Sequence, residues 1–216
     1  DSFEWFGGTV NAKYLIAYKG TDDDFDCDFG WSGTVQFALG YRDGNLADGS
    51  GSNGFEVDND ANGSANTPFT APTFANVSII GPRGSATSYV DLNFQNGAQL
   101  RRNNKIKIYN TFITGYPTGL YIDSQKGSAK ANALAGDLVT KNVVIAGTAS
   151  HGTGGFGGGN TNIYGLGVAI SDVEQLAKSS TSASILIGTE TPTVWFKAIA
   201  GNKVLTTTAN TGISSN

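Results

Sequence analysis

The stretch that decides the fold is Phe25-Asp26-Cys27-Asp28, in which apolar and acidic residues alternate. The same alternation occurs in Phe3-Glu4-Trp5-Phe6, in Phe55-Glu56-Val57-Asp58 and, more loosely, in Leu120-Tyr121-Ile122-Asp123. In an extended strand, successive side chains point to opposite faces. Each motif therefore predicts a short strand whose first and third residues point into the protein, while its acidic residues point outward.

The spacing of these motifs indicates how the strands are arranged. Phe25 follows Phe3 by 22 residues, and Phe55 follows Phe25 by 30. A unit of this length that supplies two or three short strands is typical of a β-solenoid. We therefore predict an all-β right-handed parallel β-helix, with Phe3, Phe25 and Phe55 in one inner file. A β-sandwich or jelly roll is the alternative, because it would also contain many short strands.

Further strands are expected between the motifs, where short runs of Val, Ile, Phe and Tyr end at Gly, Asn, Asp or Pro. These runs cover residues 12–18, 33–41, 73–80, 105–113, 137–146, 183–187, 194–199 and 203–207. Long loops are expected at about 43–70 and 147–167, which are rich in Gly, Asn and Ser. One short helix is expected at about 171–178, where Ser171 and Glu174 form a capping box. Residues 1–216 would then form a single β-helix domain, as a segment of a longer chain.

Composition agrees with this fold class. The 216 residues include 30 glycines, and only 15% are charged, which favours strands and turns over helical bundles. No apolar run is long enough for a membrane span. Cys27 is the only cysteine, so no internal disulfide is expected, and its phase in the motif makes it a small interior residue.

Charge is distributed unevenly along the chain. Residues 1–60 contain twelve acidic and three basic residues, a net charge of −9, whereas residues 61–216 carry +5. An acidic first part fits cation binding and disfavours nucleic acid as a partner.

Stacked motifs would bring the outward carboxylates about 4.8 Å apart, where like charges repel. Such a column predicts a Ca²⁺ site, because Ca²⁺ accepts six to eight oxygen ligands with tolerant geometry. The candidate ligands are Glu4, Asp22, Asp24, Asp26, Asp28, Glu56, Asp58 and Asp60. A solvated acidic face is the alternative. The stretch from Asp58 to Gly63 also fits half of a calcium loop, but Phe69 stands where an EF-hand needs Glu. A plain Asn/Asp/Gly turn is favoured, and a half-loop completed by a remote acid is the alternative.

A second set of residues suggests a ligand surface. Aromatic rings beside polar groups can hold sugars, and a basic cluster can meet an anionic polymer. The candidates are Trp31, Tyr41, Tyr116 and Tyr121, with Arg101, Arg102, Lys105 and Lys107. Aromatic packing at corners and a solvated basic strand remain the alternative. His151 has neither a second His nor a recognised nucleophile motif beside it and is expected to be an ordinary loop residue.

The motifs and their neighbours resemble secreted β-helix proteins of Bacteroidota, of the kind exported by the type IX system. The resemblance rests on residues 3–15, 22–30, 50–60, 100–103 and 115–120. It implies export to the cell surface or the medium, and further coils before residue 1 with a tail after residue 216. It implies no activity, and Cys27 departs from the small hydroxyl residue expected there.

These observations favour a secreted or cell-surface module that presents a repetitive face, stabilised by calcium, to a polysaccharide, to a cell-surface protein or, end to end, to another copy of itself. The competing hypothesis is a polysaccharide lyase or glycoside hydrolase. Lyases need calcium ligands and a basic residue on one face, and hydrolases need a carboxylate pair. Lys105-Ile106-Lys107 and Ser150-His151-Gly152 only partly match the motifs of pectin hydrolases.

Overall fold

The strands of the chain form two parallel sheets. The computed structural model describes residues 1–83, 89–146 and 150–154. Sheet A contains, in order, β1 (Phe3–Phe6), β4 (Phe25–Asp28), β6 (Phe55–Val57), β8 (Asn96–Leu100), β10 (Thr118–Ile122) and β12 (Ser150–Gly154). Sheet B contains β2 (Ala12–Lys13), β3 (Ile16–Tyr18), β5 (Thr34–Tyr41), β7 (Thr73–Ile80), β9 (Lys107–Thr114) and β11 (Val139–Ala146), with β2 and β3 both paired to β5.

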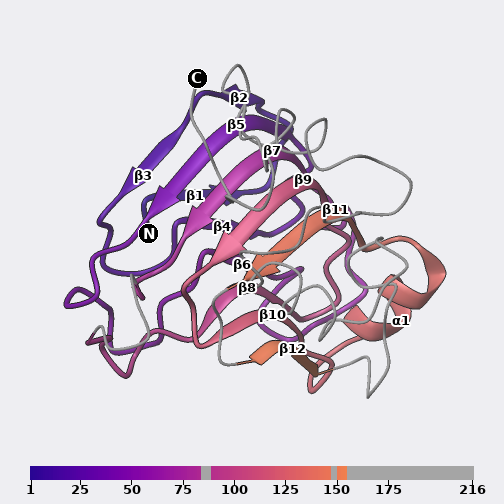
Figure 1. The fold of residues 1–216 in the computed structure, drawn as a ribbon. Coiled ribbons are helices and arrows are strands. Elements are labelled where there is room, and N and C mark those ends of the chain that lie inside the picture. Colours follow the sequence, from indigo (N-terminus) through magenta and orange to yellow (C-terminus); the bar gives the residue numbers. More distant parts are fainter. Residues whose placement is uncertain (84–88, 147–149, 155–216) are drawn as a thin grey trace.

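The chain passes from one sheet to the other and back, so each strand pairs with the strand one coil earlier (Figure 1). Every pairing between these strands is parallel. The register aligns Phe3 with Phe25, and Phe25 with Phe55, which confirms the predicted inner file. This is the arrangement of a parallel β-helix, and the antiparallel sandwich or jelly roll is wrong for the described residues. The right-handed sense of the coil stays a prediction.

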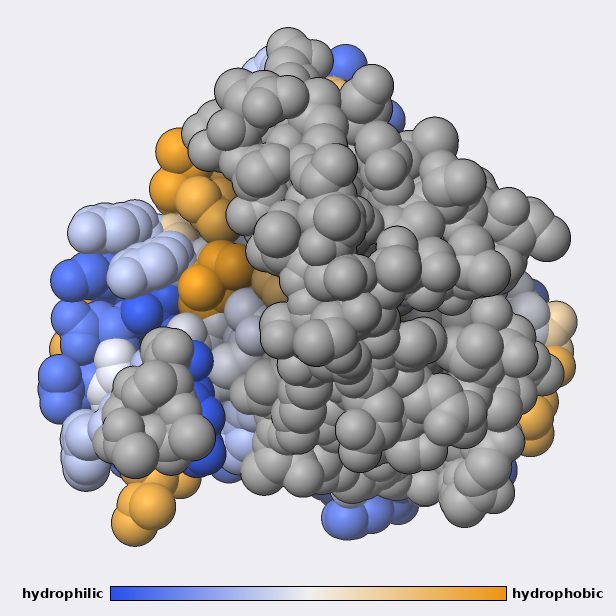
Figure 2. Space-filling model, in the orientation of Figure 1, coloured by the Kyte–Doolittle hydropathy of each residue, from blue (hydrophilic) through white to orange (hydrophobic). Residues whose placement is uncertain are grey.

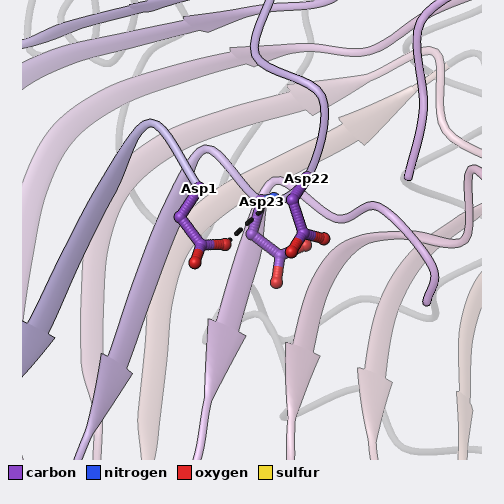
Figure 3. Close-up of side chains that lie close together, drawn as sticks. All are labelled: Asp1, Asp22 and Asp23. Atoms are coloured by element: carbon purple, nitrogen blue, oxygen red, sulfur yellow. Dashed lines mark hydrogen bonds between the residues drawn. The ribbon is translucent and has the colours of Figure 1, made fainter. Parts of the chain in front are cut away.

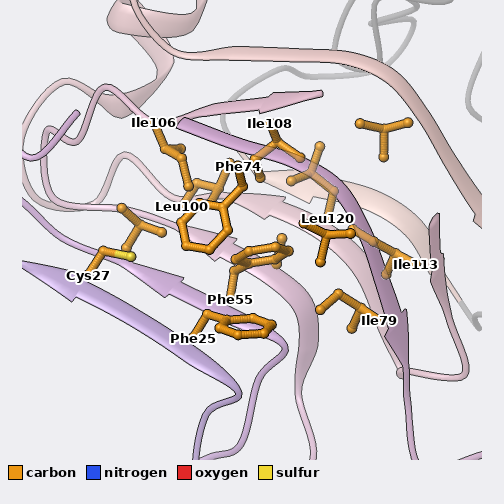
Figure 4. Close-up of a cluster of buried hydrophobic side chains, with 14 of the residues drawn as sticks. Phe25, Cys27, Phe55, Phe74, Ile79, Leu100, Ile106, Ile108, Ile113 and Leu120 are labelled. Atoms are coloured by element: carbon orange, nitrogen blue, oxygen red, sulfur yellow. The ribbon is translucent and has the colours of Figure 1, made fainter. Parts of the chain in front are cut away.

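The space between the sheets is filled by apolar side chains from both (Figure 4). The rings of Phe25 and Phe55 have their centroids 5.6 Å apart, and Phe74 from sheet B meets Phe55 edge-on at 5.0 Å. All three are fully buried. Burial of one such side chain contributes about 1.5–3 kcal/mol, so the alternation of the motifs is fixed by the core that it fills.

The long strands of sheet B depart from simple alternation at one repeated position. Over their first seven residues, strands β5, β7 and β9 share the same pattern of buried and partly exposed residues, with two consecutive partly exposed residues in the middle. The second of each pair has positive φ: 60° at Phe37, 59° at Asn76 and 48° at Asn110. Asn tolerates this left-handed conformation better than most residues. The side chain of Asn110 donates from Nδ2 to Oδ1 of Asn76 at 3.3 Å, so the irregularity is stacked from coil to coil.

Several predicted elements need correction. The expected strand 12–18 is divided into β2 and β3, and the expected strand 105–113 begins later, at Lys107. Strand β8 was not predicted, and β12 lies inside the expected loop 147–167. The expected helix 171–178 and the strands at 183–187, 194–199 and 203–207 lie outside the described residues.

The helix that the structure contains is α1 (Ala129–Ala135), at the side of the stack. Its sequence is rich in alanine, the strongest helix former. It ends at Gly136, whose φ of 81° and N–H bond to the carbonyl of Ala133 form a left-handed cap. Within the described part of the chain, no helix is long and apolar enough to cross a membrane.

Candidate functional site on the outer face of sheet A

Three carboxylates stack in register on the outer face of sheet A. Glu4 pairs with Asp26 and Asp26 with Glu56, and the column continues through Gln99 to Tyr121. Carboxylate oxygens of Asp23, Asp26 and Glu56 lie within 4.8 Å of one another. Two carboxylates at such a distance repel by about 3 kcal/mol at an effective dielectric constant of about 20. The predicted acidic column is therefore present, but it covers only the first three strands of the sheet.

A second acidic group lies at the corner where the chain enters β1 and β4. One carboxylate oxygen from each of Asp1, Asp22 and Asp23 lies within 4.8 Å of the other two (Figure 3). The backbone N–H of Asp23 donates to Oδ1 of Asp1 at 3.2 Å. Of this group, the sequence analysis named only Asp22. It missed Asp1 and Asp23 because strict alternation was extended into residues that form a turn; the run of three aspartates at 22–24 was the available signal.

Asp23 is the most buried member of this group, with 1% of its surface exposed. Its Oδ1 accepts hydrogen bonds from the backbone N–H of Asn53 at 2.5 Å and from Nδ2 of Asn53 at 3.1 Å. Its Oδ2 is buried and has no hydrogen-bond partner among the described residues. The amide of Asn96 donates in turn to Oδ1 of Asn53 at 2.9 Å, so an amide ladder supports Asp23 from two later coils.

Asp24, a predicted calcium ligand, is used elsewhere. Its Oδ1 lies 3.0 Å from Nε of Arg42, and both side chains are fully buried. The same guanidinium donates to the hydroxyl of Tyr116 and to the carbonyls of Gly20 and Asn53. Burial raises the pKa of Asp24 and the charge of Arg42 opposes that shift. Asp24 therefore belongs to an internal ion pair and is not available to a surface cation.

The remaining predicted ligands also have protein partners. Asp58 accepts from Nε of Arg101 at 2.9 Å and from a guanidinium N–H of Arg102 at 2.6 Å. Arg101 also forms an ion pair with Glu56, which links this pair to the acidic column. Asp28 accepts a hydrogen bond from the backbone N–H of Phe29 at 2.7 Å.

The half calcium loop is a turn. Oδ1 of Asp60 accepts from the backbone N–H groups of Asn62 and Ser64, and Gly63 has a φ of 65°. These contacts satisfy Asp60 within its own loop. None of the metal-ligating groups found among the described residues includes Asp24, Asp28, Asp58 or Asp60.

Burial raises the pKa of acids on this side of the molecule, including Asp58, whose pKa is raised to about 7 although it forms ion pairs with two arginines. Burial, with the neighbouring charge of Asp22, raises the pKa of Asp23 to about 6. Burial, with the charges of Asp23 and Glu4, raises the pKa of Asp26 to about 7. The ordinary value for both is 3.8. Negative charge is thus concentrated here at a cost that a bound cation would relieve.

The predicted aromatic ligand residues are divided between core and surface. Trp31 and Tyr116 are fully buried, so they cannot contact a ligand at the surface. Trp31 stacks on Trp5 with centroids 4.4 Å apart. Tyr121 is half-buried on the outer face of sheet A.

Tyr41 is exposed on sheet B, where it stacks on Tyr18 at 5.6 Å. Near these first coils, hydrophobic and hydrophilic surface lie side by side (Figure 2). The aromatic residues that remain at the surface are thus on two different sheets.

The basic candidates do not form one patch. Arg101 and Arg102 lie after β8, against the acids of sheet A. Lys105 forms an ion pair with Asp137 at 2.9 Å and lies over the ring of Phe69, and Lys107 begins β9 in sheet B. Only the two arginines therefore contribute to the face that carries the acidic column.

Cys27 and His151 were also singled out in the sequence. Cys27 is fully buried in the core, as predicted, and burial raises the pKa of its thiol well above the ordinary value. The prediction that His151 lies in a loop is wrong: it lies in β12, a Gly-rich segment that forms a strand because it pairs with β10.

Two parallel sheets linked coil by coil, with polar columns on the outer face of one, define the class of parallel β-helix proteins. Residues 1–197 match the family described as the pectate-lyase-like β-helix domain, and the chain belongs to that family. No significant match was found among curated proteins or among solved structures.

Proposed function

We propose that the chain is a polysaccharide-binding module, secreted or displayed at the cell surface, and that the outer face of sheet A is its binding surface. The observation that carries the proposal is the register of the outward polar residues. Asp26, Glu56, Gln99 and Tyr121 follow one another on successive strands, so the same kind of contact recurs along the coil axis. A repeated polar surface of this kind suits a polymer whose own groups repeat.

Chemistry favours a carbohydrate over a protein or nucleic acid partner for this face. Carboxylates and the amide of Gln99 offer hydrogen bonds to hydroxyl groups, and Tyr121 offers an aromatic ring at one end of the column. The acidic charge repels nucleic acid. Membership in a pectate-lyase-like family agrees with a glycan ligand. A cell-surface protein and end-to-end association with a second copy stay as predictions.

The test compares two tyrosines that differ mainly in the sheet that carries them. Tyr121 is half-buried on the outer face of sheet A, and Tyr109 is half-buried in β9 of sheet B. We expect the purified protein to bind one or more polysaccharides in affinity electrophoresis. Tyr121→Ala should weaken that binding at least tenfold, whereas Tyr109→Ala should leave it unchanged. Equal effects of both substitutions, or no retention on a panel of neutral and uronate polymers, would contradict the proposal.

A polysaccharide lyase is the second candidate, and the position of Arg101 favours it. Arg101 lies on the same face as the acidic column, within ion-pair distance of Glu56 and Asp58. Burial, followed by the charge of Arg102, lowers the pKa of Arg101, which would help it to accept a proton from the carbon next to a uronate carboxylate.

Incubation with uronate polymers in the presence of calcium separates the two candidates. A lyase forms unsaturated chain ends that absorb in the ultraviolet, and Arg101→Lys should abolish them, because lysine lacks the planar fork of arginine. Binding without product formation would leave the binding module as the function. Reducing ends without unsaturation would indicate a glycoside hydrolase instead.

A further inference from the structure

The corner group of Asp1, Asp22 and Asp23 has the composition of a site for a hard cation. All three side chains offer oxygen, and no nitrogen or sulfur ligand belongs to the group. Carboxylate oxygens are the ligands that Ca²⁺ and Mg²⁺ prefer. Asp1 is exposed and Asp22 is half-buried, so water can complete a coordination shell from the outer side.

An acidic cluster alone would not identify a site, since exposed acids often gather without an ion. The independent observation is the orphan oxygen of Asp23. The residue is 1% exposed, its Oδ1 accepts hydrogen bonds from Asn53, and its Oδ2 is buried with no hydrogen-bond partner among the described residues. A buried carboxylate oxygen without a donor is costly, because neither water nor protein compensates its lost hydration. Figure 3 shows the carboxylates of Asp22 and Asp23 side by side, with that of Asp1 on the neighbouring segment.

Nearby positive charge does not remove the need for a ligand. Burial raises the pKa of Asp22, and the α-ammonium group at Asp1 and, more weakly, Arg42 oppose that rise. The guanidinium of Arg42 is committed to the carboxylate of Asp24 and to backbone carbonyls, among them that of Asp22. The neighbouring group of Asp23, Asp26 and Glu56 is partly neutralised, because Glu56 is paired with Arg101. The corner group therefore has the stronger demand for a cation.

We propose that Asp23, together with Asp1 and Asp22, binds one divalent cation of the calcium type at the corner between the first two coils. The site goes beyond the proposed glycan binding, because it would link two coils of the stack whatever the outer face binds. Asp1 precedes β1 and Asp22 and Asp23 precede β4, so the ion joins segments about one coil apart in the sequence. Calcium suits the site better than magnesium, since irregular carboxylate geometry is tolerated by Ca²⁺ and not by the octahedral shell of Mg²⁺.

The test uses the whole chain and metal ions alone, without any glycan, so its outcome does not depend on the proposed function. Calorimetric titration with CaCl₂ should show saturable binding, and thermal melting should shift upward with calcium and return after addition of a chelator. MgCl₂ should bind at least tenfold more weakly. No saturable heat together with an unchanged melting temperature would overturn the proposal, and an equal response to both ions would overturn the assignment to calcium.

Asp23→Asn is the decisive variant, and Asp123→Asn is its matched control. Asn at position 23 keeps an oxygen for Asn53 but removes the charge, so calcium affinity should fall at least tenfold while the melting temperature in chelator rises or stays the same. Asp123 is half-buried just after β10 and belongs to none of the acidic groups, so its substitution should leave calcium affinity unchanged. Should Asp23→Asn fail to fold, Asp22→Asn must show the loss. Wild-type affinity in the folded Asp23 or Asp22 variant would overturn the site.

Discussion

The buried ion pair between Arg42 and Asp24 should be one of the most sensitive points in the molecule. Nε of Arg42 lies 3.0 Å from Oδ1 of Asp24, and neither side chain is exposed. The guanidinium also donates to the carbonyls of Gly20 and Asn53, each at 2.7 Å, and at 3.2 Å to the hydroxyl of Tyr116. One side chain thus joins segments from four coils. Replacement of Arg42 by Met keeps much of its volume and removes all of these interactions.

Removal of one partner from a buried pair costs about 3–5 kcal/mol, because the other charge stays buried alone. We expect Arg42→Met to reduce the free energy of unfolding by about this amount near pH 8. Burial raises the pKa of Asp24, and the loss of Arg42 removes the charge that opposes the shift. Since the folded variant then binds a proton more tightly than the unfolded chain, its stability should recover as the pH falls through the pKa of the folded state.

Urea unfolding followed by tryptophan fluorescence and circular dichroism measures this loss. The double variant Arg42→Met with Asp24→Asn removes both charges, and it should be more stable than Arg42→Met alone by at least about 1 kcal/mol. The single variant Asp24→Asn completes a double-mutant cycle, which measures the coupling energy between the two side chains. A loss below about 1 kcal/mol for Arg42→Met, or strictly additive effects in the cycle, would refute the reasoning that this pair is a coupled buried unit.

Three further predictions follow from the core, the backbone and the acids. Phe55→Ala should cost about 3–5 kcal/mol in urea unfolding, because it opens a cavity against Phe74, whereas the exposed Phe29→Ala should cost less than about 1 kcal/mol. Asn76→Val should lower the melting temperature by an amount equivalent to about 1–2 kcal/mol, since a β-branched residue fits a φ of 59° poorly, whereas Asn76→Gly should be nearly neutral. In chelator, stability should increase as the pH falls from about 8 to about 5, because the folded protein holds protons on Asp23, Asp24, Asp26 and Asp58 that the unfolded chain has lost. Melting curves that are flat over this range, or equally steep in Asp26→Asn, would contradict that assignment.

Sequence reasoning predicted best where burial alternates with a period of two. Strands β1, β4 and β6 have an apolar residue at each inward position, and the hydrophobic effect makes that phase nearly obligatory. Equivalent motifs pair in register, so the alignment of Phe25 with Phe55 could be inferred from the sequence. The outward position of Asp26 and Glu56 followed from the same phase.

Elements with little side-chain signal could not be predicted in this way. Strand β8 has the sequence NGAQL, in which small and polar residues have low β propensity, and it forms a strand because β6 and β10 pair with its two edges. The positive φ of Phe37 could not be predicted from the sequence either, because phenylalanine rarely adopts this conformation and the irregularity is recognised only from its repetition in neighbouring coils. Tertiary pairing supplies both features.

The candidate site shows the same limit in its chemistry. Alternation placed Asp22 and Asp24 together as ligands, but Asp24 turns inward to Arg42, which follows it by 18 residues. Asp23, which stands between them in the sequence, joins Asp1 and Asp22 in the corner group, where its Oδ2 has no hydrogen-bond partner among the described residues. No local sequence pattern predicts that Asp24 forms the ion pair and Asp23 joins the acidic group, because this depends on which acid the buried Arg42 neutralises.

Charge balance along sheet A explains why the proposed ion belongs at one end of the stack. From the third strand onward, the acids have arginine partners: Arg101 pairs with Glu56 and Asp58, and Arg102 with Asp58. In the first two strands, no ion pair of the described residues involves Asp23 or Asp26. A cation bound at Asp23 would do there what the arginines do two coils later. The same column could then keep its register over its whole length, which a continuous run of unpaired carboxylates would oppose.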